Sequence, residues 1–475
     1  MVIQKLLIQY LLMPLARLME KVPERAREYL FVAGGLGVGF EIMRQNLQLP
    51  SQRYLVYFAI GCVSLGIMIL ATLRTDIKPV RFRKGISICW FGVGFMLLQS
   101  ALRLNIDYIA EAIIFLVAFP VVFICWNNAD RTQIFKLLLR IIKILAVVFM
   151  VASLFFAKIS IAQYAGIFNN PNGAAELLMM TVGCQIVEIL YAKRLDKKCW
   201  SDILLLGCSV AVCYYTNSRT GYLAMICAVL FGGVMYLLTH DRKENFKCLI
   251  RLTAAAVVTV ICVFNLIYAF QWRAKLDIPF PDLSGESAQI SAAAGNSADT
   301  GENTQGTAQN PAQTTAEPEF SGIEAFQIIA KKKGETAGKS FDQISTGRLT
   351  LWKFYASNLN LFGHASVPKV YVPLTGETIG TPHMSILMFA YESGAFAGIF
   401  YFLLNLLSGL LTIGFAWKFR KEKYAVMPLV VTVVFGVGSL LSASTSALVY
   451  IISFYYYCVL FPVMVYQPEK EDERE

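Results

Sequence analysis

Long apolar stretches recur along most of this chain, and their length constrains the fold more than any other feature. Each spans about 20 residues, the length that an α-helix needs to cross the ~30 Å hydrocarbon core of a bilayer. Only 16% of the residues are charged, against about a quarter in soluble domains. The sequence therefore predicts an all-α polytopic membrane protein.

We expect about twelve transmembrane helices, because a backbone inside lipid must satisfy its own hydrogen bonds. The expected spans are 29–43, 54–73, 85–104, 108–126, 141–156, 173–191, 202–216, 222–239, 249–270, 395–416, 425–442 and 447–466. The chain then divides into a cytoplasmic amphipathic segment (1–28), a first transmembrane group (29–270), a large external loop (271–383), the last three spans (384–467) and a charged cytoplasmic tail (468–475).

Basic residues cluster in alternate loops, which indicates the orientation of the spans. The positive-inside rule places these loops and both termini in the cytoplasm and the remaining loops outside. The formal charge of +10 therefore reports topology in the cytoplasmic membrane and not a nucleic-acid partner. The loop residues that define the cytoplasmic side are Arg74, Lys78, Arg81, Arg83, Lys84, Arg131, Lys136, Lys193, Arg194, Lys197, Lys198, Arg242, Lys243, Lys247, Lys418, Arg420, Lys421 and Lys423.

The large external loop has two parts of different composition. Residues 284–320 are rich in Ala, Ser, Thr, Gly, Asn and Gln and carry too few large apolar groups to form a core, so we expect a disordered insertion. Residues 321–383 regain aromatic residues and helical patterning, and should be ordered against the membrane.

Neither a metal nor another cofactor is expected. All 11 cysteines lie within or beside the apolar stretches, and no CxxC pair exists, so the cysteines are interpreted as small packing residues. The external loops contain no DxD motif and no His/Cys cluster.

One arginine interrupts an apolar run that is too long for a single span. Residues 202–239 would extend about 55 Å as one helix, so the chain must turn back, and "TNSRTG" supplies the turn, with Gly221 expected to relieve the backbone. The turn places Arg219 at the external membrane face. It is either an interfacial side chain that reaches lipid phosphates or part of an anion site.

Three further external motifs carry polar side chains next to apolar stretches. "STGRLTLW" places Arg348 and Trp352 four residues apart, on one helical face. "TPHMSILMFAYESG" places His383, one of three histidines, at the mouth of an apolar stretch, where a helix cap or a packing residue is the simpler interpretation. "GIFNNPNGAAE" places Asn172 beside Pro171 before a span, which is typical of a turn and a helix N-cap.

Taken in order, "FNNPNGAAEL", "NSRTGYLA", "GRLTLW" with "LFGH", and "PHMSILMFAYESG" resemble the O-antigen ligase/polymerase family of bacterial envelope glycosyltransferases. The resemblance runs from about residue 166 to the end of the chain. The sequence departs from the family pattern at His364, where a second glycine is common, and at Met384, where an asparagine is common. The resemblance implies a GT-C-like membrane fold and an active site on the external side.

The resemblance also implies a reaction. Family members transfer a glycan from a polyprenyl diphosphate to an acceptor hydroxyl, which is part of a glycan, a lipid or a wall polymer. Arg219 and Arg348 would then bind the diphosphate without a metal, since guanidinium groups hold phosphate oxygens in pairs. His383 would activate the acceptor hydroxyl, with an unperturbed pKa of about 6.5 suited to a base. Asn172, Trp352 and Asp342 would support the site.

Several alternatives stay open at this point. A polymerase and a ligase fit the resemblance equally well. A transporter or lipid flippase would place its charged residues near the bilayer midplane. A peptidoglycan polymerase of the shape-and-division type would rely on an external acidic residue, for which Asp342 is the candidate. Glu392 is a further possible base, and Glu111, Glu176 and Glu188 either mark a proton path or pair with polar neighbours.

Overall fold

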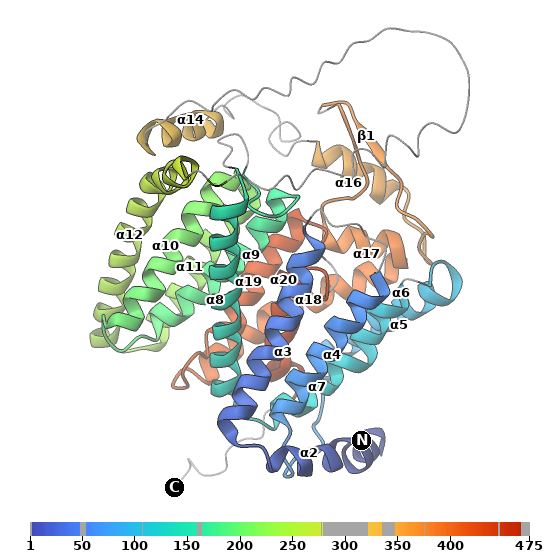
Figure 1. The fold of residues 1–475 in the computed structure, drawn as a ribbon. Helices are drawn as coiled ribbons and strands as arrows, with labels where there is room; N and C mark the ends of the chain where they lie inside the picture. Colours follow the sequence, from blue (N-terminus) through green and yellow to red (C-terminus); the bar gives the residue numbers. More distant parts are fainter. Residues whose placement is uncertain are drawn as a thin grey trace, which may run out of the picture.

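The computed structural model describes residues 2–47, 54–106, 108–158, 164–276, 278, 322–334, 347–374, 376–444 and 447–466, and these residues are mostly helical (Figure 1). Nine helices of this part are long and apolar enough to cross a membrane, and the shorter apolar helices 58–72 and 427–441 accompany them. The chain is therefore a mostly helical, multi-pass membrane protein. Some of the about twelve expected spans, such as 29–43 and 447–466, are not among the nine.

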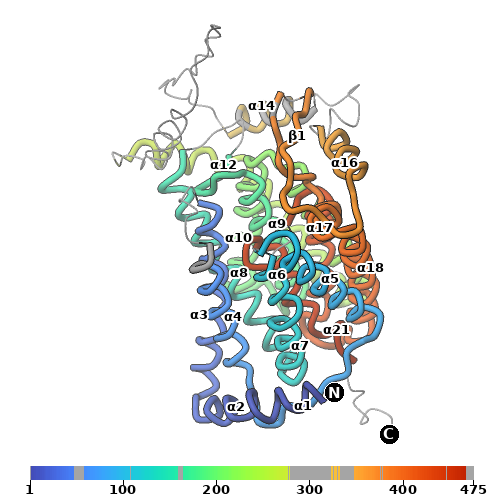
Figure 2. Tube along the Cα trace, turned by 90° about the vertical axis from the view of Figure 1, so that its right-hand side faces the viewer, coloured from blue at the N-terminus to red at the C-terminus, as the bar shows by residue number. Residues whose placement is uncertain are grey.

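The N-terminal segment forms α1 (Val2–Leu7), a π-helical turn η1 (Ile8–Leu12) and α2 (Met13–Glu20). Its length and composition would allow it to span a membrane, yet Figures 1 and 2 show α2 lying across one end of the bundle. Its inner side buries Ile8, Leu12 and Ala16, whereas Val2, Ile3, Leu6, Tyr10, Leu11 and Leu18 are exposed. The interfacial position expected for 1–28 stays a prediction, and an exposed apolar side of this kind is compatible with it.

The bundle begins with α3 (Glu24–Gln45), α4 (Tyr54–Thr72) and α5 (Lys84–Arg103). The expected span 108–126 is one continuous helix, Tyr108–Asn127, made of α6 (Tyr108–Ile113), the π-helical turn η2 (Ile114–Ala118) and α7 (Phe119–Asn127), with Pro120 in the first turn of α7. Proline lacks an amide hydrogen, which accounts for a local change of helix geometry in an otherwise apolar run. Next comes α8 (Arg131–Phe156), which begins ten residues before the expected span 141–156 and is capped by Asp130.

The centre of the bundle is α9 (Pro171–Leu190), which packs against α8, α10 (Lys197–Thr216), α11 (Arg219–Thr239), α19 (Met427–Leu441) and α20 (Ile451–Val459). All residues of α9 from Ala174 to Leu190 are buried. The bundle is completed by α12 (Arg242–Lys275), which is longer than the expected span 249–270, by α18 (Ala395–Lys418) and by the short α21 (Phe461–Met464). Pro462 ends the last expected span early, so that 447–466 is not one helix.

The long loop carries short elements at the end of the bundle away from α2 (Figure 1). They are α14 (Gly322–Gly334), α16 (Arg348–Ser357) and an antiparallel hairpin of β1 (Val370–Val372) and β2 (Glu377–Ile379); α17 (Ser385–Ser393) follows directly after the loop. The hairpin was not expected from the sequence. A small core of Leu351, Tyr355, Val372, Leu387 and Tyr391 joins α16, β1 and α17. The insertion 284–320 and the tail 468–475 lie outside the described residues.

Candidate functional site

Arg219 is the first residue of α11. The "TNSRTG" motif turns the chain as expected: α10 ends at Thr216, Asn217 adopts a left-handed conformation (φ 57°), and the Ser218 side chain caps α11 by accepting from the Gly221 amide at 3.3 Å. Gly221 was expected to relieve the backbone of the turn, but it lies within α11 and not in the turn. A Cβ there would come within 2.8 Å of Cys213 Sγ and 3.4 Å of Ala175 Cβ, so glycine permits close helix packing. Arg219 itself is exposed.

Arg348 is the first residue of α16, and Trp352 follows one turn later on the same helix. Gly347 precedes them with φ 82°, and a Cβ at this position would lie 2.2 Å from Val372 Cγ1, so the motif requires glycine for both conformation and space. The Trp352 indole Nε1 donates to the Pro382 carbonyl at 2.9 Å. This bond ties the helix that carries Arg348 to the residue before His383.

His383 lies two residues before α17 and has a left-handed backbone (φ 49°). His383 is not a helix cap, since Met384 occupies the N-cap position and no side-chain hydrogen bond caps the helix, whereas its partial burial leaves the packing interpretation in place. Left-handed conformations are uncommon for residues other than glycine, although histidine tolerates them better than most.

Charge effects link Arg219 to Arg348 and Arg348 to His383. Burial, and then the positive charge of Arg219, lower the pKa of Arg348 from its usual 12.5. Burial, and then the charge of Arg348, lower the pKa of His383 from 6.5 to about 4. The pKa of His383 therefore lies below the near-neutral value expected from the unperturbed side chain. Burial and mutual repulsion destabilise the positively charged forms of Arg348 and His383, and a bound anion would stabilise these forms.

Four helix N-termini carry the predicted residues. Asn172 is the second residue of α9, where Asn170 caps the helix by accepting from the Asn172 amide at 2.8 Å. The first turns of α9 and α11 pack together, because Ala175 contacts Gly221. With Arg348 opening α16 and His383 preceding α17, each motif lies at a helix start, where amide groups and the helix dipole favour anions.

A serine-containing segment completes this region, and the sequence analysis missed it. The segment, here called the serine segment, is 442–444, directly after α19. Ser442 and Ser444 donate to Glu176 Oε1 at 2.8 and 2.6 Å. The polar run "SASTS" between two apolar stretches was a signal for it, but its partner in α9 lies 266 residues away from Ser442.

Asp342 lies outside the described residues, so its supporting role stays a prediction. Glu392 is the eighth residue of α17, at the other end of this helix from His383. Among the residues that the structure describes, no group of three or more His, Cys, Asp or Glu side chains is arranged to hold a metal ion.

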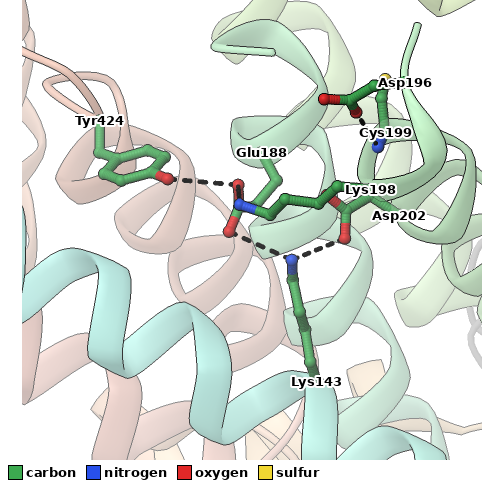
Figure 3. Close-up of polar contacts among 7 residues, drawn as sticks. All are labelled: Lys143, Glu188, Asp196, Lys198, Cys199, Asp202 and Tyr424. Atoms are coloured by element: carbon green, nitrogen blue, oxygen red, sulfur yellow. Dashed lines mark hydrogen bonds and ion pairs between the residues drawn. The ribbon is translucent and has the colours of Figure 1, made fainter. Parts of the chain in front are cut away.

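A second polar cluster lies towards the other end of α9 (Figure 3). Lys143 of α8 pairs with Glu188 of α9 at 3.1 Å and with Asp202 of α10 at 2.6 Å. Glu188 also pairs with Lys198 at 3.5 Å and accepts from the Tyr424 hydroxyl at 3.3 Å. Glu176 and Glu188 thus both have polar partners, as the simpler interpretation of these residues expects, and the cluster joins α8, α9 and α10.

Replacing Lys143 by methionine should destabilise the bundle. Glu188 and Asp202 side chains are each only 7% exposed, and removal of one partner from a buried ion pair costs on the order of 3 kcal/mol. Thermal unfolding in detergent should show a clearly lower midpoint for Lys143→Met. Lys247→Met is the matched control, because Lys247 and Glu244 form an exposed pair whose loss should change little. Equal midpoints for the two variants would contradict the structural role of the cluster.

A cavity of about 510 Å³ lies at the end of the bundle near α2 and is lined by residues that include Glu20, Arg27, Arg74 and Asp130. None of the predicted site residues lines this cavity.

Comparisons with models of protein families, with curated proteins and with solved structures found no match to this chain. Any statement about its activity therefore depends on its own residues and on the motifs they form.

Proposed function

We propose that this protein is a glycosyltransferase of the O-antigen ligase/polymerase type, acting at the external face of the bacterial cytoplasmic membrane in surface polysaccharide assembly. One observation supports the proposal: the charge of Arg219 acts on Arg348 and the charge of Arg348 acts on His383, although the three residues come from distant motifs, at the starts of α11 and α16 and just before α17. The donor would be a glycan on polyprenyl diphosphate, and the acceptor a hydroxyl of a glycan, lipid or wall polymer.

The chemistry follows from the charges. The acceptor oxygen forms a bond to the anomeric carbon while the bond from that carbon to the phosphate oxygen breaks, and polyprenyl diphosphate leaves with the electron pair. The two guanidinium groups and the helix N-termini stabilise the negative charge that grows on the leaving group. Neutral His383 takes the proton of the acceptor hydroxyl. Bound diphosphate offsets the charge of Arg348 and raises the pKa of His383 from about 4, which makes it a better base.

The test supplies the purified protein in detergent with a defined lipid-linked oligosaccharide. Transfer should produce either a ladder of longer products, which identifies a polymerase, or a single product on an added acceptor, which identifies a ligase. Product should not depend on divalent metal ions. If the oligosaccharide stays on its carrier with every acceptor offered, while the protein moves the intact lipid across vesicle membranes, the flippase alternative is correct.

A further inference from the structure

Glu176 lies one helical turn below Asn172 in α9 and is 6% exposed. Its Oε1 accepts from the hydroxyl groups of Ser442 and Ser444, and Ser444 Oγ also lies 3.1 Å from Ser442 Oγ. Glu176 therefore holds the serine segment from the side of α9. Apolar helices alone would not fix the conformation of such a segment, because its polar groups need partners away from water.

The serine segment is held from two other helices as well. Ser385, the first residue of α17 and fully buried, places its hydroxyl 3.0 Å from the Ser442 carbonyl and 3.1 Å from the Ser444 carbonyl. Ser453 of α20 donates to the same Ser444 carbonyl at 3.0 Å. The hydrogen-bonded path from Glu176 thus ends at the start of α17.

His383 is fixed between two such anchors. On one side, Trp352 of α16 donates to the Pro382 carbonyl. On the other side, Ser385 binds the serine segment. A left-handed residue other than glycine persists only where the surroundings impose it, at a cost of about 1–3 kcal/mol. Hydrogen bonds thus hold the chain on both sides of His383, whose backbone is left-handed.

We infer that Glu176 is a positioning residue for His383, acting through the serine segment and Ser385. This inference rests on the proposed function for its kinetic consequences. What the path requires of residue 176 is an acceptor oxygen, since both serine hydroxyls donate to Oε1. A negative charge is not required, so the amide oxygen of glutamine should serve as well.

The test compares four variants in the transfer assay. Glu176→Leu and Ser385→Ala should each lower kcat by about 10- to 100-fold, because a small displacement of a reacting group has effects of this order. The KM for the lipid-linked donor should change little, since the arginines stay in place. Glu176→Gln should restore kcat. Thr181→Val is the matched control on α9, because the Thr181 hydroxyl bonds only its own helix, to the Leu177 carbonyl.

Two further readouts separate positioning from a general loss of structure. Loss of the anchor in Glu176→Leu should expose His383. Burial is the larger cause of the lowered pKa of His383, so exposure should raise this pKa. The rise of kcat/KM with pH, which follows deprotonation of His383, should therefore move upward from about pH 4. The double variant Glu176→Leu/Ser385→Ala should be no worse than either single one, as members of one path are not additive. Wild-type kcat in Glu176→Leu, or an inactive Glu176→Gln, would overturn the inference.

A measurement that needs no activity distinguishes failure of this inference from failure of the proposed function. Diethyl pyrocarbonate modifies neutral, accessible histidines, and mass spectrometry of peptides reports His383 separately from His240 and His364. Glu176→Leu should increase the modification rate of His383, with Glu176→Gln and Thr181→Val unchanged. An unchanged rate in Glu176→Leu would refute the positioning role even if the wild-type protein transfers no glycan.

Discussion

Replacing Arg219 or Arg348 by alanine is expected to lower the kcat of glycan transfer by about 10³-fold. Each guanidinium would stabilise charge that appears on the leaving diphosphate, and removal of one such group typically costs 10²- to 10³-fold or more. Arg348→Lys should retain part of the activity, because lysine keeps the charge but loses the paired donors that match phosphate oxygens. Initial rates with a saturating lipid-linked donor provide the measurement.

Lys353→Ala is the control for this prediction. Lys353 is exposed on the same helix as Arg348, so its loss removes a positive charge from α16 without touching the site. Wild-type rates in Arg219→Ala and Arg348→Ala would contradict the assignment. Loss of activity in Asp342→Asn together with full activity in Arg219→Ala would instead favour a polymerase that depends on an acidic residue.

Replacing His383 by alanine is expected to lower kcat by about 10²- to 10⁴-fold, the range typical of a general base. In the wild-type protein, activity should rise with pH as the imidazole loses its proton. For kcat/KM, which reports the free protein, this limb lies near the pKa of about 4. For kcat, the bound diphosphate raises the pKa, so the limb should lie at higher pH.

The variant Arg348→Ala tests whether His383 causes the predicted pH dependence. Because the charge of Arg348 lowers the pKa of His383, its removal should move the acid limb of kcat/KM upward. The residual activity of His383→Ala should show no such limb. Intact transfer by His383→Ala would exclude His383 as the base, and a limb that stays in place in Arg348→Ala would show that the two side chains do not interact.

Local features of the site were predictable from the sequence. The turn before Arg219 and the helix start at Asn170 follow from capping chemistry within a few residues. The helix through Arg348 and Trp352 also follows from local pattern. In the bundle, hydropathy located most of the long helices, including the continuous helix Tyr108–Asn127, but did not indicate the π-helical turn η2 or the early end of α20 before Pro462, because apolar composition does not report helix geometry.

Features that depend on distant contacts were not predictable. Glu176 meets its serine partners across 266 and 268 residues, and no single stretch of sequence indicates that pairing. The lowered pKa of His383 arises from burial and from Arg348, which belongs to another motif. Gly221 was assigned to a turn, although the reason for glycine there is the neighbouring helix that contributes Ala175.

The most direct test is a structure of the protein with a non-transferable phosphonate analogue of a polyprenyl-diphosphate-linked glycan. We predict that the two phosphorus groups lie between the guanidinium groups of Arg219 and Arg348, within hydrogen-bond distance of both, with His383 facing the anomeric carbon. An analogue bound in the cavity beside α2, or held without contact to either arginine, would contradict the account.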